Sequence, residues 1–490
     1  MKKNTLLKTL SLLVFLLSAE KSLAVAMDFT GTYRFEWMEL DRPTLTSPGD
    51  RKAYGLNYLG LNGKIIASDG INIHTRLDVL PNTDAAYANT QFGQQWGSGN
   101  ANTSTTNVAN ANSTSKSPDS QFLKVSQLYL NVNQEYGSLT IGRAPFHFGL
   151  GINYNAGQGA FDHYATVMDM VAFKFLIDNV QYMPMIARVY DPELSQGGVL
   201  QSESFMIEYQ SPDNGNLIGV ILERKKGSST VNDVPVNTGA APNSNPNGIS
   251  VDTPVERTDI SVQKTSFVLG KEWEPFGFKI EAGFVNGDLG LKKNGQGIRW
   301  NAYGIASELY FPRPQSKWDW RLHMGFATGD NPDTADYESF HFDRNYNVAF
   351  LLFNHRLGSY DALRTGLIRD QYNPTDGTVR KTVGTSLDDE AVSNTFYVSP
   401  RVKYIWNDKL DLVNTLTYAN LVANPMSGVT LNKSLGFEWD IEFVYKPRER
   451  VQWVNQIGLM FPGGAFKDDA IPGSNNGFTY GFSSKAAISF

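Results

Sequence analysis

The segment that ends the chain, residues 478–490, alternates strictly between two kinds of side chain. Its even positions are mostly aromatic or aliphatic and end on Phe490, whereas its odd positions are small or polar. A period of two predicts a β-strand with one apolar and one polar face. Such a strand needs neighbours that are apolar on the same side. The pattern therefore predicts that the chain is a series of similar strands that close on this one.

The same alternation recurs along the chain. In 29–37 the odd residues, from Phe29 to Trp37, are expected to face outward, and Arg34 and Glu36 inward. In 435–445 the odd residues from Leu435 to Tyr445 are apolar and are also expected outside. Further alternating segments are 71–79 and 318–326.

Short and long connections between these segments also alternate. This asymmetry is typical of outer-membrane barrels with short periplasmic turns and long extracellular loops. The pattern predicts one all-β transmembrane antiparallel barrel of about 18 strands, an even number with both termini on the periplasmic side. The inward and outward faces of 139–148, 180–190 and 217–226 are ambiguous, and a bulge would explain Pro145. Short connections are expected near 68–70, 136–138, 178–179, 212–216, 274–277, 312–316, 407–409 and 446–450, and long ones near 82–120, 149–168, 191–200, 226–256, 287–298, 329–393, 422–433 and 462–476.

The N-terminus carries an export signal. Lysines precede a short apolar run, and small residues follow it, so residues 1–24 are interpreted as a signal peptide cleaved after Ala24 or Ala26, which leaves 27–490 as the barrel. A net charge of −6 argues against nucleic acid as a partner. A soluble β-sandwich or β-helix is the alternative fold, because its strands alternate too. Aromatic residues at strand ends and the absence of a 20–50 residue repeat disfavour it.

Charged side chains on the polar faces predict a wet interior, because a barrel of this width leaves an aqueous channel unless it is plugged. The longest connection, 329–393, is expected to fold into or over the pore mouth, because its apolar run 348–353 needs a partner. Its acids would then face wall bases such as Arg401 and Lys403. The predicted pore-lining residues are Arg34, Glu36, Arg76, Asp78, Lys174, Lys279, Glu281, Arg321, Arg401, Lys403, Glu438, Asp440 and Glu442, and the predicted constriction loop carries Asp330, Asp333, Asp336, Asp343 and Arg344.

No motif supports catalysis, a cofactor or a metal. Gly149-Leu150-Gly151 and Gly157-Gln158-Gly159 lack a following helix and are interpreted as flexible loop glycines. The six histidines lack zinc-site spacing, and the acidic run 330–338 lacks the calcium-loop motif. The chain is therefore predicted to be a non-enzyme channel for passive diffusion of small hydrophilic solutes. The alternative is a plugged barrel that acts as an outer-membrane enzyme or a surface adhesin.

Two stretches carry a family resemblance: 141–151, Ile-Gly-Arg-Ala-Pro-Phe-His-Phe-Gly-Leu-Gly, and 329–334 together with 342–346. They resemble porin-type barrels of the alginate-export class, which implies an 18-stranded barrel and a transport role. Alginate exporters of that class line the pore with an arginine excess, whereas inward acids and bases nearly balance here. Resemblance to outer-membrane barrels also implies recognition of Phe490 by the barrel-assembly machinery, and contact with outer-membrane lipid and lipopolysaccharide. A homo-oligomer is left open.

Overall fold

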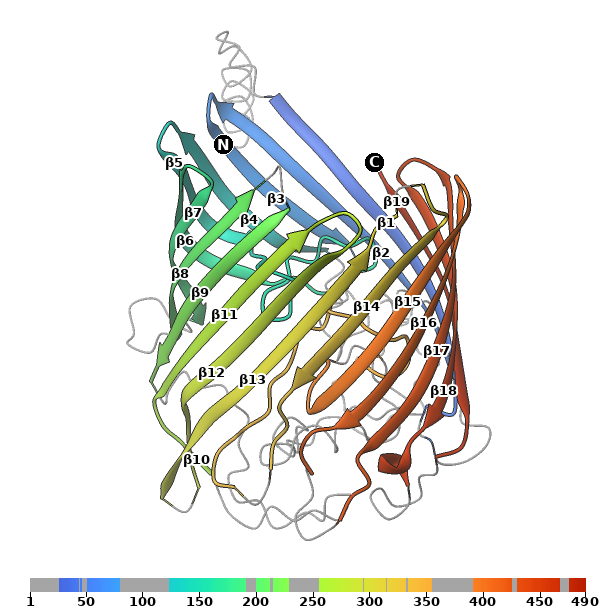
Figure 1. The fold of residues 1–490 in the computed structure, drawn as a ribbon. Coiled ribbons are helices and arrows are strands. Elements are labelled where there is room, and N and C mark those ends of the chain that lie inside the picture. The colour runs from blue at the N-terminus through green and yellow to red at the C-terminus, as the bar shows by residue number, and fades with distance from the viewer. Residues whose placement is uncertain are drawn as a thin grey trace, which may run out of the picture.

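The chain forms one closed antiparallel barrel (Figure 1). The computed structural model describes residues 26–43, 45, 51–79, 123–190, 200–211, 215–228, 255–293, 295–313, 315–331, 334–354, 391–424, 430–467 and 476–490. The predicted signal peptide and the predicted loop 82–120 lie outside the described residues. In the described part, no helix has the length and apolarity to cross a membrane.

Alternation of side chains along each segment lets neighbouring segments pair as strands with one apolar face. Every pair of neighbouring strands is antiparallel, and their hydrogen-bond ladders satisfy the backbone groups of the wall. The strands are β1 (Ala26–Asp41), β2 (Arg51–Ser68), β3 (Ile71–Val79), β4 (Leu123–Gln134), β5 (Gly137–Pro145), β6 (Val167–Ile177), β7 (Val180–Tyr190), β8 (Leu200–Ser211), β9 (Asn216–Gly227), β10 (Val255–Arg257), β11 (Ile260–Glu272), β12 (Gly277–Lys293), β13 (Gln296–Phe311), β14 (Trp318–Ala327), β15 (Thr395–Asn407), β16 (Leu410–Leu421), β17 (Ser434–Arg448), β18 (Val451–Pro462) and β19 (Thr479–Ser489), with one 3₁₀ turn, η2 (Gly464–Phe466).

The predicted closure and strand number are confirmed. β19 pairs with β1 from Thr32 opposite Ser489 to Leu40 opposite Gly481. The backbone of Phe490 exchanges two hydrogen bonds with Gly31, at 2.8 and 2.9 Å, and the absence of a Cβ on Gly31 leaves room for its ring. β10 and β11 follow one another along the same edge of β12, so the described residues build a wall of 18 strands.

The two rims differ as the connection lengths predict. Both ends of the barrel chain and the short turns lie at one rim, and the strand ends that the long connections join lie at the other (Figure 1). The first short turn, Asp69-Gly70, joins β2 to β3, with Gly70 at a φ of 75°. The prediction of a long loop over 287–298 was wrong. β12 and β13 continue through it to Lys293 and from Gln296, and a bulge between Asp288 and Leu291 interrupts the alternation there.

The outer face carries a belt of exposed apolar side chains, and the alternation predicts most of its members. On β17, for example, Phe437, Trp439 and Phe443 are exposed, whereas Glu438 and Asp440 are buried on the inner side. Leu435 was predicted outside but is fully buried inside. Its register with β16 shifts at this point, beside Gly436 at a φ of 110°, so a bulge reverses the direction of its side chain.

The three ambiguous segments are strands β5, β7 and β9. Pro145 does not lie in a bulge. It is the last residue of β5, opposite Val167 of β6, at the point where the chain leaves the wall. A proline suits this place because a strand end does not need another ladder N–H.

Candidate functional site: the lumen and its inward loops

Two connections whose residues the structure largely describes enter the barrel. The first inward loop, residues 146–166, follows β5. Its residues Leu150, Gly151 and Ile152 donate three backbone hydrogen bonds, of 2.6, 2.9 and 3.3 Å, to Oε2 of Glu281 on β12. Gly149 and Gly151 have positive φ angles of 63° and 84°, which aim these N–H groups at one point. The Gly-Leu-Gly motif, predicted to be flexible, thus forms a nest for a carboxylate of the barrel itself.

The far end of the first inward loop reaches β1. His163 Nε2 lies 2.7 Å from Oε1 of Glu36, and Arg34 Nε lies 2.7 Å from the same oxygen. The guanidinium of Arg34 also donates a 2.6 Å hydrogen bond to the carbonyl oxygen of Asp162. Because β12 and β1 lie far apart around the wall, the loop crosses the lumen (Figure 1).

The second inward loop, residues 328–354 and 391–394, follows β14. Its apolar run 348–353 is buried, as its hydrophobicity predicted, but against the inner wall. Carboxylates of β17 hold its backbone: Phe350 N–H donates to Asp440 at 3.1 Å, and Leu351 and Leu352 donate to Glu438 at 2.6 and 2.8 Å. Wall glycines make room for its rings, because a Cβ on Gly304, Gly458 or Gly481 would overlap its side chains.

The two loops also bind each other. Asp343 N–H donates to the carbonyl of Ile152 at 2.7 Å, and the Thr166 hydroxyl donates to the Asp343 carboxylate at 3.3 Å. The Asn345 side chain exchanges two hydrogen bonds, of 2.6 and 3.1 Å, with the backbone of Tyr164. Burial raises the pKa of the Asp343 carboxyl above its ordinary value, and the Asn345 backbone N–H partly offsets this effect.

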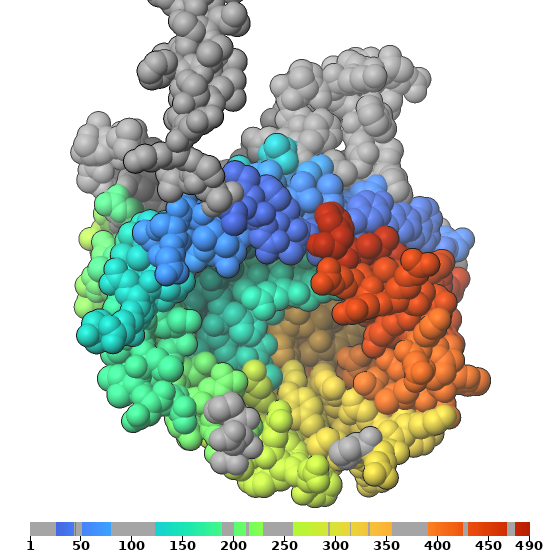
Figure 2. All heavy atoms as spheres, turned by 90° about the horizontal axis from the view of Figure 1, so that it is seen from above, coloured from blue at the N-terminus to red at the C-terminus, as the bar shows by residue number. Residues whose placement is uncertain are grey.

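Together the loops form a floor across the barrel. Seen from the rim that carries the termini, the lumen is hollow and ends on teal and ochre atoms, the colours of the two loops (Figure 2). Beyond this floor, side chains of the second inward loop and of the wall form a large apolar cluster. The polar space therefore lies on the side of the first inward loop.

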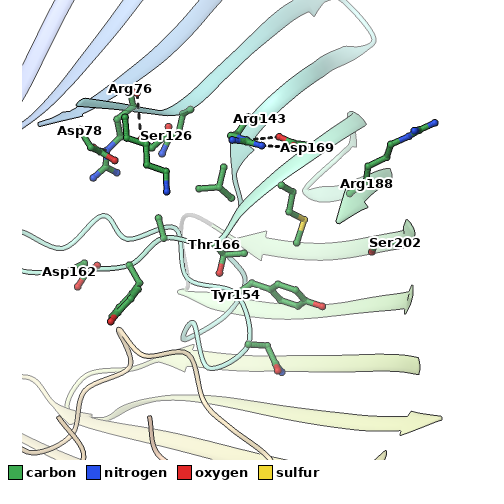
Figure 3. A pocket seen from close by; sticks show the side chains of 18 of the residues that line it. Arg76, Asp78, Ser126, Arg143, Tyr154, Asp162, Thr166, Asp169, Arg188 and Ser202 are labelled. Carbon is green, nitrogen blue, oxygen red and sulfur yellow. Dashed lines mark hydrogen bonds and ion pairs between the residues drawn. The ribbon is translucent and has the colours of Figure 1, made fainter. Parts of the chain in front are cut away.

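Two cavities flank the first inward loop. The larger measures about 520 Å³ and lies between the loop and strands β2 to β11 (Figure 3). The smaller measures about 350 Å³ and shares Tyr58, Arg76, Gln127 and Asp162 with it. At this shared wall the Arg76 guanidinium binds the Asp78 carboxylate at 2.8 Å and also contacts the Tyr58 hydroxyl, which donates to Asp78 at 2.6 Å.

The predicted pore-lining residues divide into two groups. Arg34, Glu36, Glu281, Glu438 and Asp440 point inward but are buried beneath the inward loops, and Lys279 donates to the Gly149 carbonyl oxygen at 2.6 Å. The others lie on open wall: Arg76 and Asp78 line the larger cavity, Lys174 is exposed, Lys403 and Arg321 bind Asp319 at 3.3 and 3.2 Å, and Arg401 lies 3.8 Å from Glu442.

The predicted acids of the constriction loop do not form one row across a passage. Asp330 is buried and accepts the Glu338 backbone N–H at 3.0 Å, and Asp336 is half-buried in the same turn. Asp333 lies outside the described residues. Arg344 stacks over the Tyr164 ring at 5.0 Å. The bases Arg401 and Lys403, which were expected opposite these acids, pair with acids of the wall.

Sequence analysis missed most of the bases around the larger cavity. Arg188, Lys225 and Lys264 lie on β7, β9 and β11, where the alternation gave no clear assignment of faces for two of the three strands. Lys124 and Arg143 lie at the ends of β4 and β5. Within the described ranges, no group of His, Asp and Glu side chains is arranged to hold a metal ion.

Comparisons with known proteins give structural matches only. No family model and no curated protein matches the chain. Similar solved structures include a BenF-like porin from Pseudomonas fluorescens Pf-5 (TM-score 0.48, 9% identity, 95% of this chain and 98% of that one). OccK9 (OpdG) and OpdQ of Pseudomonas aeruginosa give TM-scores of 0.47 and 0.46 at 8% identity, each with 95% of this chain and 98% of the other covered. These values assign the chain to no family, and the resemblance to the alginate-export class stays a prediction.

Proposed function

We propose that the protein is an outer-membrane channel for passive diffusion of small hydrophilic solutes and that it favours anions. The observation that carries the proposal is the contrast between the two faces of the wall. The outer face is an apolar belt that water would not solvate, and the inner face carries charges around open cavities. A closed barrel is the sheet that satisfies its backbone in lipid, because it has no edge.

Anion preference follows from a recount of the inward charges. The sequence suggests a balance, but four acids, Glu36, Glu281, Glu438 and Asp440, are used as anchors of the loops, against only two bases, Arg34 and Lys279. On its inner side the larger cavity is lined by four bases and three acids, which leaves a basic excess in the polar space beside the first inward loop. Fixed charge acts most strongly on a permeating ion where a passage is narrow. These bases are Arg76, Lys124, Lys225 and Lys264, and these acids are Asp78, Asp162 and Glu223.

Planar-bilayer recording tests the proposal. Purified protein should give discrete conductance steps, and a KCl gradient should give a reversal potential of the sign expected for chloride preference. Lys124→Gln with Lys225→Gln should move that potential toward zero. Lys409→Gln, at an exposed turn away from the cavities, is the matched control. Cation preference in the unmodified protein would contradict the recount.

The plugged barrel is the second candidate, because the second inward loop packs an apolar cluster against the inner wall. Such a barrel would act through its surface as an enzyme or adhesin. Absence of conductance steps from protein that migrates as a folded barrel would favour it over the channel.

A further inference from the structure

The wall is interrupted beside the larger cavity. β5 pairs with β4 only as far as Arg143 opposite Leu128, and after Pro145 its chain turns into the lumen. β4 continues beyond Leu128 to Leu123, paired with β3 on one side. On its other side, no described strand pairs with residues 123–127. The first inward loop thus leaves a notch in the wall where β5 and β6 would otherwise extend.

The larger cavity reaches both faces of the wall at this notch. From inside it is lined by Tyr58, Ser202 and Glu223, and its border also includes Arg143, Asp169 and Arg188 (Figure 3). The register places these last three residues on the outer face. Arg143 lies opposite Leu128, whose side chain is 54% exposed, and Asp169 lies opposite both arginines. Directly opposed residues of antiparallel strands share a face.

The notch opens at the edge of the apolar belt. Val171 lies two residues from Asp169, and Ile186 lies two residues from Arg188, so each shares the outer face with its charged neighbour. Their side chains are 51% and 57% exposed. The next strands show the same change, from exposed Phe205 to Glu203 on β8 and from exposed Leu222 to Arg224 on β9. This charged row marks the level at which the belt ends.

The lips of the notch combine cations with apolar surface. Arg143 binds Asp169 through two hydrogen bonds of 2.7 Å, and the pair is about half exposed. Arg188 flanks Asp169 on the other side, and Lys124 lines the opposite lip. Two arginines thus flank one carboxylate, and Lys124 faces the same cavity from across the opening. Exposed Leu123, Val125 and Leu128 continue the apolar belt up to that opposite lip.

We infer that this notch is a side entrance to the lumen for amphiphiles with an anionic head and one apolar tail. The head is drawn to Arg143, Arg188 and Lys124 and passes into the polar cavity, while the tail stays on the apolar belt. A small ion entering from water needs no such apolar lip. The inference rests on the proposed function in one respect, which is that the belt lies in a membrane.

The chain has no cysteine, so a single introduced cysteine reports on the notch. Val167→Cys places a thiol at the base of the opening, where Val167 pairs with Pro145 and lines the cavity. In proteoliposomes, dodecanoate should slow its reaction with a water-soluble maleimide by about tenfold, whereas equal concentrations of acetate or uncharged dodecyl maltoside should not. Asn407→Cys, at a turn on the opposite rim, should be insensitive to all three.

Arg143→Gln combined with Arg188→Gln, in the Val167→Cys background, should weaken the dodecanoate effect by about tenfold, the change expected for loss of one charge-assisted hydrogen bond. Arg224→Gln is the control on the same charged row, because Arg224 does not line this cavity. Met168→Cys gives a second reporter if the first variant assembles poorly.

Equal protection by acetate and dodecanoate would overturn the inference, as would no protection at either reporter. Unchanged protection after removal of both arginines would also overturn it. Conductance of the same proteins separates this inference from the proposed function. If the protein conducts but dodecanoate does not protect the introduced thiol, only the side-entrance inference is refuted. If dodecanoate protects the thiol but the protein does not conduct, only the channel proposal is refuted.

Discussion

The second inward loop should leave the wall when Glu438 is replaced by alanine. Glu438 is fully buried, and its two carboxylate oxygens accept the backbone N–H groups of Leu351 and Leu352. Each buried N–H left without a partner costs about 1–3 kcal/mol, so the docked loop loses about 2–6 kcal/mol. Even the lower figure shifts the ratio of docked to detached loop by about 30-fold.

Single-channel recording is the assay. A detached loop frees the space that it now occupies along the inner wall, so Glu438→Ala should conduct more than the unmodified protein and with more fluctuation. Glu442→Ala is the matched control. Glu442 is another inward acid on the same strand, beyond Asp440, but it lies 3.8 Å from Arg401 instead of holding the loop. If Glu438→Ala and Glu442→Ala conduct alike, the carboxylate does not hold the loop and the argument fails.

Three further predictions concern the belt, the terminus and the contact between the loops. Trp439→Arg, on the exposed belt of β17, should lower the free energy of unfolding in lipid by about 2–4 kcal/mol if it lies near the midplane, as measured by urea titration in vesicles. Deletion of Phe490 should reduce the yield of membrane-assembled barrel, whereas Ser489→Ala should not. Equal yields would contradict recognition of Phe490 by the barrel-assembly machinery. Because the pKa of Asp343 is raised, its stabilising contribution is fully present at pH below its unfolded pKa and is lost as pH rises through its folded pKa. Conductance should therefore change over this acidic range, and Asp343→Asn should abolish the change.

The wall could be predicted from the sequence because alternation is a local property of a strand. The outward side chains on β17 and β19, and the short turns, follow directly from it. The prediction from alternation failed where a single residue exchanges the inward and outward positions of the strand. At Leu435 a bulge reverses the face, because it inserts one residue without a partner on β16, beside Gly436 at a φ of 110°.

The site could be predicted only in part, because a strand pattern says which face a side chain takes and not what covers it. Glu281 and Glu438 were correctly placed inside, but their partners are N–H groups of loops more than 80 residues away. The burial of the apolar run 348–353 was foreseen from its hydrophobicity. The notch at Pro145 was not, because it depends on where β5 stops pairing with β4.

The wall glycines that make room for the second inward loop form a recess, and this recess also bears on the order of events during assembly. Its glycines lie on strands from separate parts of the chain: Gly304 on β13, Gly458 on β18 and Gly481 on β19, with Leu40 of β1 against Gly481. Because β1 and β19 meet only when the seam closes, the complete recess does not exist in an open sheet. The contact with Leu40 can therefore form only after closure, so the packing of the loop is completed by the same step that closes the barrel.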